Sequence, residues 1–134
     1  MKANDFRIGN MVSYYHPAVE GLEPLIGHVI NKAEDDIIIA EYQHASLRTY
    51  SIGGIFLTDR WLKELGFRPL KGRGNVYSLN KIELVGDSEN KKFYFIDGFK
   101  YAKNIKYLHQ LQNLYFEIHN DELSLIADTK AIAS

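Results

Sequence analysis

The sequence predicts an α+β fold. We expect an N-terminal SH3-like curled β-sheet or small barrel, a short linking helix, and a second small antiparallel sheet packed by one C-terminal helix. Short runs of β-branched and aromatic residues, separated by polar turns, fill most of residues 11–101. Such residues favour strands. The longest segment with a clear helical period, 104–122, follows these runs. A helix that comes after strands, instead of alternating with them, is typical of an α+β domain.

The first half is expected to contain four strands, at residues 11–15, 25–31, 37–42 and 46–52. Proline at position 17 ends the first of them, and residues 16–24 are predicted to form an exposed loop. Several short strands joined by polar turns within about fifty residues are typical of a small curled sheet or barrel.

A short helix is predicted at residues 58–66. Thr58 is its expected N-cap, Asp59 lies in the first turn, and Gly66 follows the C-terminus. Trp61 is placed on its apolar face and is expected to pack between the two halves of the chain. The predicted organisation is therefore an SH3-like β-rich lobe at 1–57 and a second lobe at 58–134, folding as one cooperative unit.

The second half is expected to form strands at residues 67–70, 76–79, 82–85 and 93–96, with a last short strand at 123–126. Lys71–Asn75 and Asp87–Asn90 are predicted hairpin loops, and Asp97-Gly98 is a tight-turn signal that leads into residues 99–101.

The final helix is predicted from an apolar stripe at helical spacing, made by Tyr107, Leu108, Leu111, Leu114, Tyr115 and Ile118. Asn104 is its expected N-cap and Asn120 its expected end. His109, Gln112 and Asn113 are expected on a solvated face of this helix or in hydrogen bonds to the neighbouring sheet, and the alternative is a polar recognition face. The predicted core consists of Val12, Val29, Ile38, Trp61, Leu65, Phe95, Leu108, Leu111 and Tyr115.

Composition excludes several chemistries. The chain has no Cys, which removes disulfides, thiolate zinc sites and Cys nucleophiles. No apolar run approaches the roughly 18 residues of a membrane span, and the N-terminus lacks the apolar core of a signal peptide, so we expect a cytoplasmic protein with no membrane contact. Residues 1–66 carry six Lys/Arg against nine Asp/Glu, and residues 67–134 carry ten against eight. This weak asymmetry does not by itself indicate a nucleic-acid binder.

Three segments carry a resemblance: NDFRIGNMV at the start, LTDRWLKELGF in the middle and IKYLHQLQNLYFEIHNDEL near the end. In this order they resemble a family of small uncharacterised proteins that recur in gut Bacteroidetes-type genomes, often near phage or other mobile-element genes. The resemblance implies a cytoplasmic, phage-associated accessory protein. The family has no established activity, substrate or catalytic residues, so the resemblance assigns no role to any residue.

The sequence contains no strong catalytic, metal-binding or cofactor-binding motif. The five histidines show no HExxH or HxH spacing, and no GxSxG or dinucleotide-binding fingerprint is present. The loop Lys71–Asn75 combines glycines with cations and could hold phosphate, although a flexible hairpin tip is the better interpretation. Aromatic and basic residues alternate around Tyr94, a pattern that can stack nucleic-acid bases.

The leading hypothesis is a non-enzymatic binding or adaptor module of a phage or mobile element, with a protein partner and no catalytic, cofactor or metal site. The alternative is a nucleic-acid-associated accessory protein that uses the basic C-terminal half. An enzyme acting on a small phosphorylated ligand ranks last. A homodimer formed through exposed strand edges is compatible with each. The candidate partner or nucleic-acid contacts are Arg68, Lys71, Arg73, Tyr94, Lys103, Lys106, His109 and Asn113.

Overall fold

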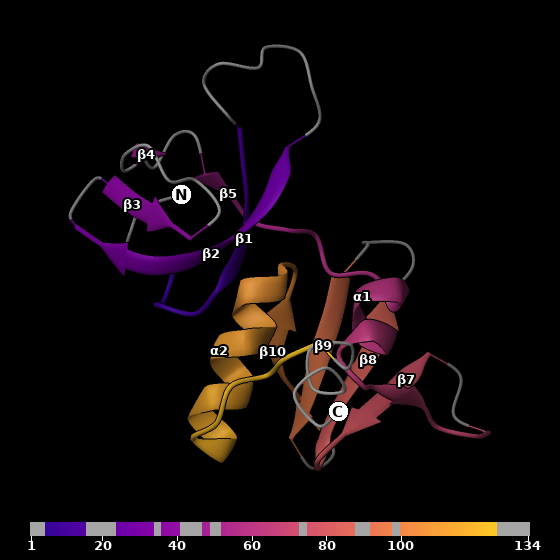
Figure 1. Cartoon of the computed structure of the whole chain (residues 1–134). Helices are drawn as coiled ribbons and strands as arrows, with labels where there is room; N and C mark the ends of the chain where they lie inside the picture. Colours follow the sequence, from indigo (N-terminus) through magenta and orange to yellow (C-terminus); the bar gives the residue numbers. More distant parts are fainter. Residues whose placement is uncertain are drawn as a thin grey trace, which may run out of the picture. The chain divides into compact units, whose positions relative to one another are not determined.

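The computed structural model describes residues 5–15, 24–33, 36–40, 47–48, 52–72, 75–87, 92–97 and 100–125. The chain divides into two compact units, Met1–Ile55 and Phe56–Ser134, a boundary two residues before the predicted one. Each unit contains its own antiparallel sheet, and the second also carries the C-terminal helix (Figure 1). The α+β class is therefore confirmed.

The first unit is built on a five-stranded sheet with the order β4-β3-β2-β1-β5. Its strands are β1 Met11–Tyr14, β2 Leu25–Lys32, β3 Asp36–Ile39, β4 Leu47–Arg48 and β5 Ile52–Gly53. The first three agree closely with prediction. Within the strand predicted at 46–52, residues 47–48 form β4 and residue 52 begins β5, while residues 46 and 49–51 lie outside the described part of the chain. β4 pairs with β3 and β5 pairs with β1, so these two strands are the two edges of the sheet. The described strands form no closed barrel.

The core of the first unit lies on one face of this sheet. Its buried side chains are Phe6, Val12, Tyr14, Val29, Ile37, Ile39 and Ile52. Gly27 faces the same core, because a Cβ placed there would meet the Ile39 side chain and lie 2.9 Å from the Tyr14 ring. The prediction that Ile38 belongs to the core is wrong. Successive strand residues point to opposite faces, so burying Ile37 and Ile39 leaves Ile38 exposed.

The second sheet has the order β10-β9-β8-β7-β6, with each strand antiparallel to its neighbours. Its strands are β6 Arg68–Pro69, β7 Val76–Leu79, β8 Ile82–Asp87, β9 Lys92–Asp97 and β10 Lys100–Ile105. β6 and β7 pair as an antiparallel hairpin, and residues 73 and 74 of the loop predicted between them lie outside the described residues. Asn80 and Lys81, both at positive φ, form the tight turn between β7 and β8.

Helix α1 (Asp59–Glu64) has the predicted capping residues at both ends. The Thr58 hydroxyl oxygen accepts a hydrogen bond from the Trp61 amide, 3.3 Å away. Gly66, at φ 97°, donates to the Lys63 carbonyl, and the Phe67 amide donates to the Leu62 carbonyl. These two bonds form a Schellman C-cap, which fixes where the chain turns into β6.

The N-cap of helix α2 (Leu108–His119) is Tyr107, three residues later than predicted, because Asn104 belongs to β10. Asn104 is therefore not the N-cap. Gln110 caps the start of the helix instead, because its Oε1 accepts hydrogen bonds from the amides of Lys106 (2.8 Å) and Tyr107 (3.0 Å). The helix ends at Asn120, which adopts the left-handed conformation as predicted.

The core of the second unit lies between its sheet and its helices. Leu65, Leu108, Leu111 and Tyr115 are buried as predicted. Two core assignments are wrong: Trp61 is partly exposed, since α1 buries its neighbour Leu62 instead, and Phe95 is partly exposed whereas Phe93 on the same strand is buried. The strand predicted at 123–126 is also absent from the described residues 123–125, although Leu123 is buried.

Candidate functional site

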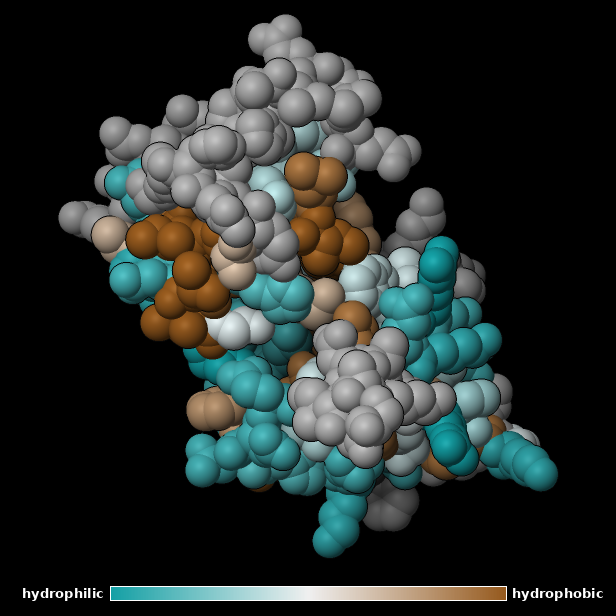
Figure 2. Space-filling model, in the orientation of Figure 1, coloured by the Kyte–Doolittle hydropathy of each residue, from teal (hydrophilic) through white to brown (hydrophobic). Residues whose placement is uncertain are grey.

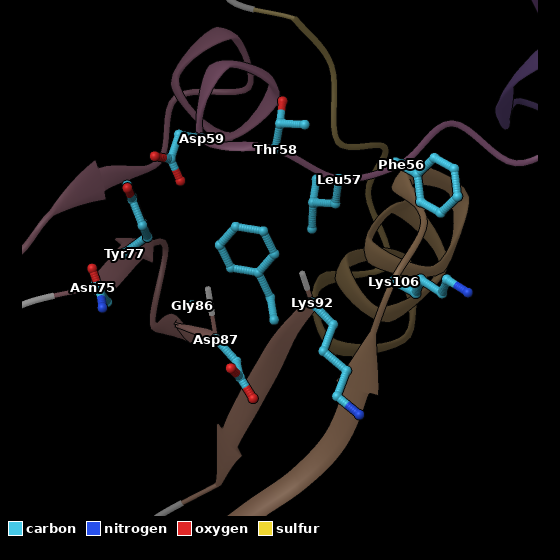
Figure 3. Close-up of a pocket in the computed structure, with 11 residues that line it drawn as sticks. Phe56, Leu57, Thr58, Asp59, Asn75, Tyr77, Gly86, Asp87, Lys92 and Lys106 are labelled. Atoms are coloured by element: carbon cyan, nitrogen blue, oxygen red, sulfur yellow. The ribbon is translucent and has the colours of Figure 1, made fainter. Parts of the chain in front are cut away.

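A pocket of about 780 Å³ opens in the second unit, at the end of the sheet where α1 begins (Figure 3). It is formed by the segment before α1, the start of β7, the end of β8, the start of β9 and the residue after β10. The described residues that line it are Phe56, Leu57, Thr58, Asp59, Asn75, Tyr77, Gly86, Asp87, Lys92, Phe93 and Lys106.

The walls of the pocket are largely apolar. Leu57 and Phe93 are buried, and the rings of Tyr77 and Phe93 meet edge to face with centroids 6.1 Å apart. Gly86 leaves room for the Phe93 ring, since a Cβ at position 86 would lie 3.3 Å from that ring. The Gly86 amide donates to the carbonyl of Asn75 (2.8 Å), which holds the end of the β6–β7 hairpin against β8.

Tyr77 on β7 and Asp59 at the start of α1 form a polar pair inside the pocket. Figure 3 shows the phenol oxygen of Tyr77 pointing at the carboxylate of Asp59. Burial raises the pKa of Tyr77, and its hydrogen bond to Asp59 and the negative charge of that carboxylate raise the pKa further. Tyr77 therefore keeps its proton at neutral pH and donates to Asp59.

The rim carries an exposed aromatic and cationic cluster, which we name the Phe56 cluster: Phe56, Lys106 and Tyr107. Phe56 is 60% exposed. Its ring lies 5.2 Å from that of Tyr107, and the Lys106 ammonium lies 5.6 Å from the Phe56 centroid and 5.4 Å from the Tyr107 centroid. Phe56 and Tyr107 form an antiparallel β-bridge, and the Leu57 amide donates to the Lys106 carbonyl (3.0 Å). These contacts connect the segment before α1 to the segment before α2.

Two further charges line the pocket on neighbouring strands. Asp87 and Lys92 are direct partners across the β8–β9 pair. The Lys92 ammonium lies 5.4 Å from the ring centroid of Tyr94. The lining therefore contains two carboxylates and two ammonium groups.

The structure brings few of the predicted contact residues together. Lys106 lines the pocket, whereas Tyr94 is not in the lining and contacts the ammonium of Lys92 through its ring face. Arg68 is on β6 and Lys103 on β10, the two opposite edges of the sheet. Lys71 is exposed in the β6–β7 hairpin, and the predicted contact at Arg73 lies outside the described residues.

His109 and Asn113 do not form the predicted polar surface. His109 and Gln112 are almost fully buried, and only Asn113 is partly exposed. The His109 ring stacks on Tyr107, with centroids 5.6 Å apart. The expectation of a solvated face is wrong here because the buried arc of α2 is wider than its apolar stripe.

The first unit offers a second surface of interest. Ile26 and Ile30 on β2 and Ile38 on β3 are between 38% and 52% exposed, and Figure 2 shows hydrophobic surface on this unit. Exposed apolar residues are common on monomeric proteins, and these three do not line the pocket of the second unit.

Within the described part of the chain, no three His, Asp or Glu side chains gather as a metal site, and no helix is long and apolar enough to cross a membrane. Comparison with known proteins adds no assignment, since no family model, curated protein or solved structure matches the chain.

The sequence did not indicate most of the pocket. Phe56, Leu57, Tyr77, Gly86 and Phe93 come from four separate segments and show no common motif. One local signal existed: Leu57 precedes the N-cap Thr58 and Leu62 is the fourth helical residue, the pattern of a hydrophobic staple. That pattern predicts a buried Leu57, which the structure has, but it says nothing of a cavity.

Proposed function

We propose that the protein is a non-enzymatic binding module with a protein partner, and that the pocket of the second unit receives a large apolar side chain of that partner. The observation that carries this proposal is the open, apolar-walled pocket with the exposed Phe56 at its rim. Exposed aromatic residues beside an apolar cavity are the usual anchors of protein recognition.

Binding fits the polar groups of the pocket better than catalysis does. A general base has to be unprotonated near neutral pH so that it can accept a proton from the substrate. The shift of Tyr77 runs the other way, because its pKa is raised, and Asp59 already accepts the Tyr77 hydrogen bond. This pair is suited to holding β7 against the start of α1.

A protein partner fits the charge distribution better than nucleic acid does. Arg68 and Lys103 stand on opposite edges of the sheet, so these two predicted basic contacts form no continuous track for a phosphate backbone. The nucleic-acid alternative keeps one supporting observation, the Lys92 ammonium over the ring of Tyr94, an arrangement that can stack a base.

The proposal extends to the first unit and to the biological setting. Only three residues separate β4 from β5, yet these strands are opposite edges of one sheet. That arrangement supports an SH3-like curled sheet, since curling brings distant edges toward each other. We place the partner in the cytoplasm, among the proteins of a phage or mobile element or of its host, in keeping with the sequence resemblance.

The test is capture of partners from a host lysate by the tagged full chain, with and without nuclease and at two salt concentrations. Three proteins are compared: the wild type, Phe56→Ala, and the control Ile118→Ala, which removes an exposed apolar side chain of α2 outside the pocket. A protein that survives nuclease, binds the control and is lost with Phe56→Ala supports the proposal. Capture abolished by nuclease, or equal for all three proteins, contradicts it.

A further inference from the structure

We propose that the pocket selects an acidic segment: a polypeptide whose apolar anchor is accompanied, within about two residues, by an Asp or Glu that Lys106 binds. This inference rests on the proposed function and adds the chemistry of the partner. It follows from how Lys106 is held and from how the other charges of the pocket are placed.

The backbone of Lys106 is fixed on both sides. Its amide donates to Gln110 Oε1 (2.8 Å) and its carbonyl accepts from the Leu57 amide (3.0 Å). The side chain therefore starts from a defined point at the pocket rim, between the end of β10 and the start of α2. A fixed origin reduces the conformational entropy lost when the ammonium engages a ligand.

The ammonium of Lys106 is available to an anion. Its contacts are the faces of Phe56 and Tyr107, and no described carboxylate lies within ion-pair distance of it. Ring faces leave an ammonium with hydrogen-bond donors to spare, since each ammonium has three. Lys106 is exposed, so a carboxylate can approach it from solvent.

The other charges of the pocket lie next to polar or charged neighbours. Asp59 accepts from Tyr77, and Asp87 stands directly across from Lys92 in the β8–β9 pair. Lys106 differs from these charges in its place: it stands at the rim beside the exposed Phe56 ring, where a carboxylate of a ligand can reach it. Because an extended chain advances about 3.3 Å per residue, an acidic residue one or two positions from an anchor in the pocket can reach the rim.

The test is selection of a random peptide library on the immobilised full chain, followed by sequencing of the enriched peptides. The wild type should enrich peptides with a large apolar residue and an Asp or Glu one or two positions away. Lys106→Glu should keep the apolar preference and reverse the charge preference. The matched control is Lys103→Glu, the same charge change on an exposed lysine of β10 outside the pocket, which should leave the preference unchanged.

Affinities of one enriched acidic peptide, measured by fluorescence polarisation, give the size of the effect. An exposed ion pair of this kind corresponds to an affinity loss of roughly two- to fivefold for Lys106→Met, and charge reversal should cost more. Raising the salt concentration should reduce the difference in peptide affinity between wild type and Lys106→Met.

Failure of this inference is distinct from failure of the proposed function. Peptides that depend on Phe56 but show no acidic preference, or show a basic one, overturn the inference and leave the binding pocket intact. If none of the enriched peptides depends on Phe56, both the inference and the proposed function are overturned. Labelled single-stranded DNA or RNA that binds the wild type and is released by Lys106→Glu would assign this site to nucleic acid and contradict the acidic-peptide partner.

Discussion

Replacing Gly27 by Ala tests the packing of the first unit, because this glycine is where β2 approaches its core most closely. An added Cβ would collide with the Ile39 side chain and lie 2.9 Å and 3.1 Å from two atoms of the Tyr14 ring. Ile39 and Tyr14 are both almost fully buried, so neither can move into solvent.

The expected cost follows from two opposed effects. Overpacking a core costs about 1–3 kcal/mol, and reducing the freedom of the unfolded chain returns about 0.4–1 kcal/mol. The free energy of unfolding should therefore fall by on the order of 1–2 kcal/mol. For a unit of this size, that corresponds to a melting temperature lower by roughly 5–15 °C.

The assay is thermal unfolding followed by circular dichroism and by tryptophan fluorescence. Trp61 is the single Trp and lies in the second unit, so its fluorescence reports that unit while circular dichroism reports both. If the two units form one cooperative unit, as the sequence predicts, both signals shift together. The control is Gly53→Ala, whose Cβ would meet only the Ser13 hydroxyl oxygen, at 3.0 Å. A Gly27→Ala melting curve equal to that of wild type, or of Gly53→Ala, would refute the packing argument.

Three further predictions concern the second unit. Thr58→Ala should lower the free energy of unfolding by about 1 kcal/mol through loss of the N-cap, with Thr58→Ser restoring most of it in urea titrations. Leu62→Ala should cost about 2–5 kcal/mol and Trp61→Ala clearly less, because Leu62 is fully buried and Trp61 is not; equal losses by circular dichroism would contradict the structure. The raised pKa of Tyr77 means that its stabilisation is fully present below the pKa of an unfolded tyrosine and is lost as the pH rises through the higher folded-state value. As the pH rises above about 10, the pKa of an unfolded tyrosine, wild type should therefore lose more stability than Tyr77→Phe, and parallel pH profiles would argue against the Tyr77–Asp59 pair.

Local signals predicted the elements well. Local capping rules predicted Thr58 as the N-cap of α1 and Gly66 as the residue after its C-terminus, and the structure has both. Ile38 shows where such rules stop. In a run of three isoleucines, alternation says that one face is buried but not which one, and the choice depends on pairing with β2, where the register shifts between Val29 and Asn31.

The start of the long helix and the pocket needed tertiary information. Asn104 has the side chain of an N-cap, yet the pairing of β10 with β9 extends the strand through Ile105 and moves the helix start. The pocket depends on strand ends that are as far apart in sequence as Phe56 and Lys106. Only Lys106 of this lining was among the predicted contacts, and it was named for its charge.

The central claim is that the pocket beside Phe56 is the surface at which a partner binds. The most direct test is the dissociation constant of an enriched peptide for wild type, Phe56→Ala and Ile118→Ala, with folding of each checked by circular dichroism. Since Phe56 is mostly exposed in the free chain and would be covered by a ligand, its removal should cost on the order of 1–2 kcal/mol, or about 5- to 30-fold in affinity, while Ile118→Ala should bind as wild type does. Equal affinity for all three proteins would contradict the account.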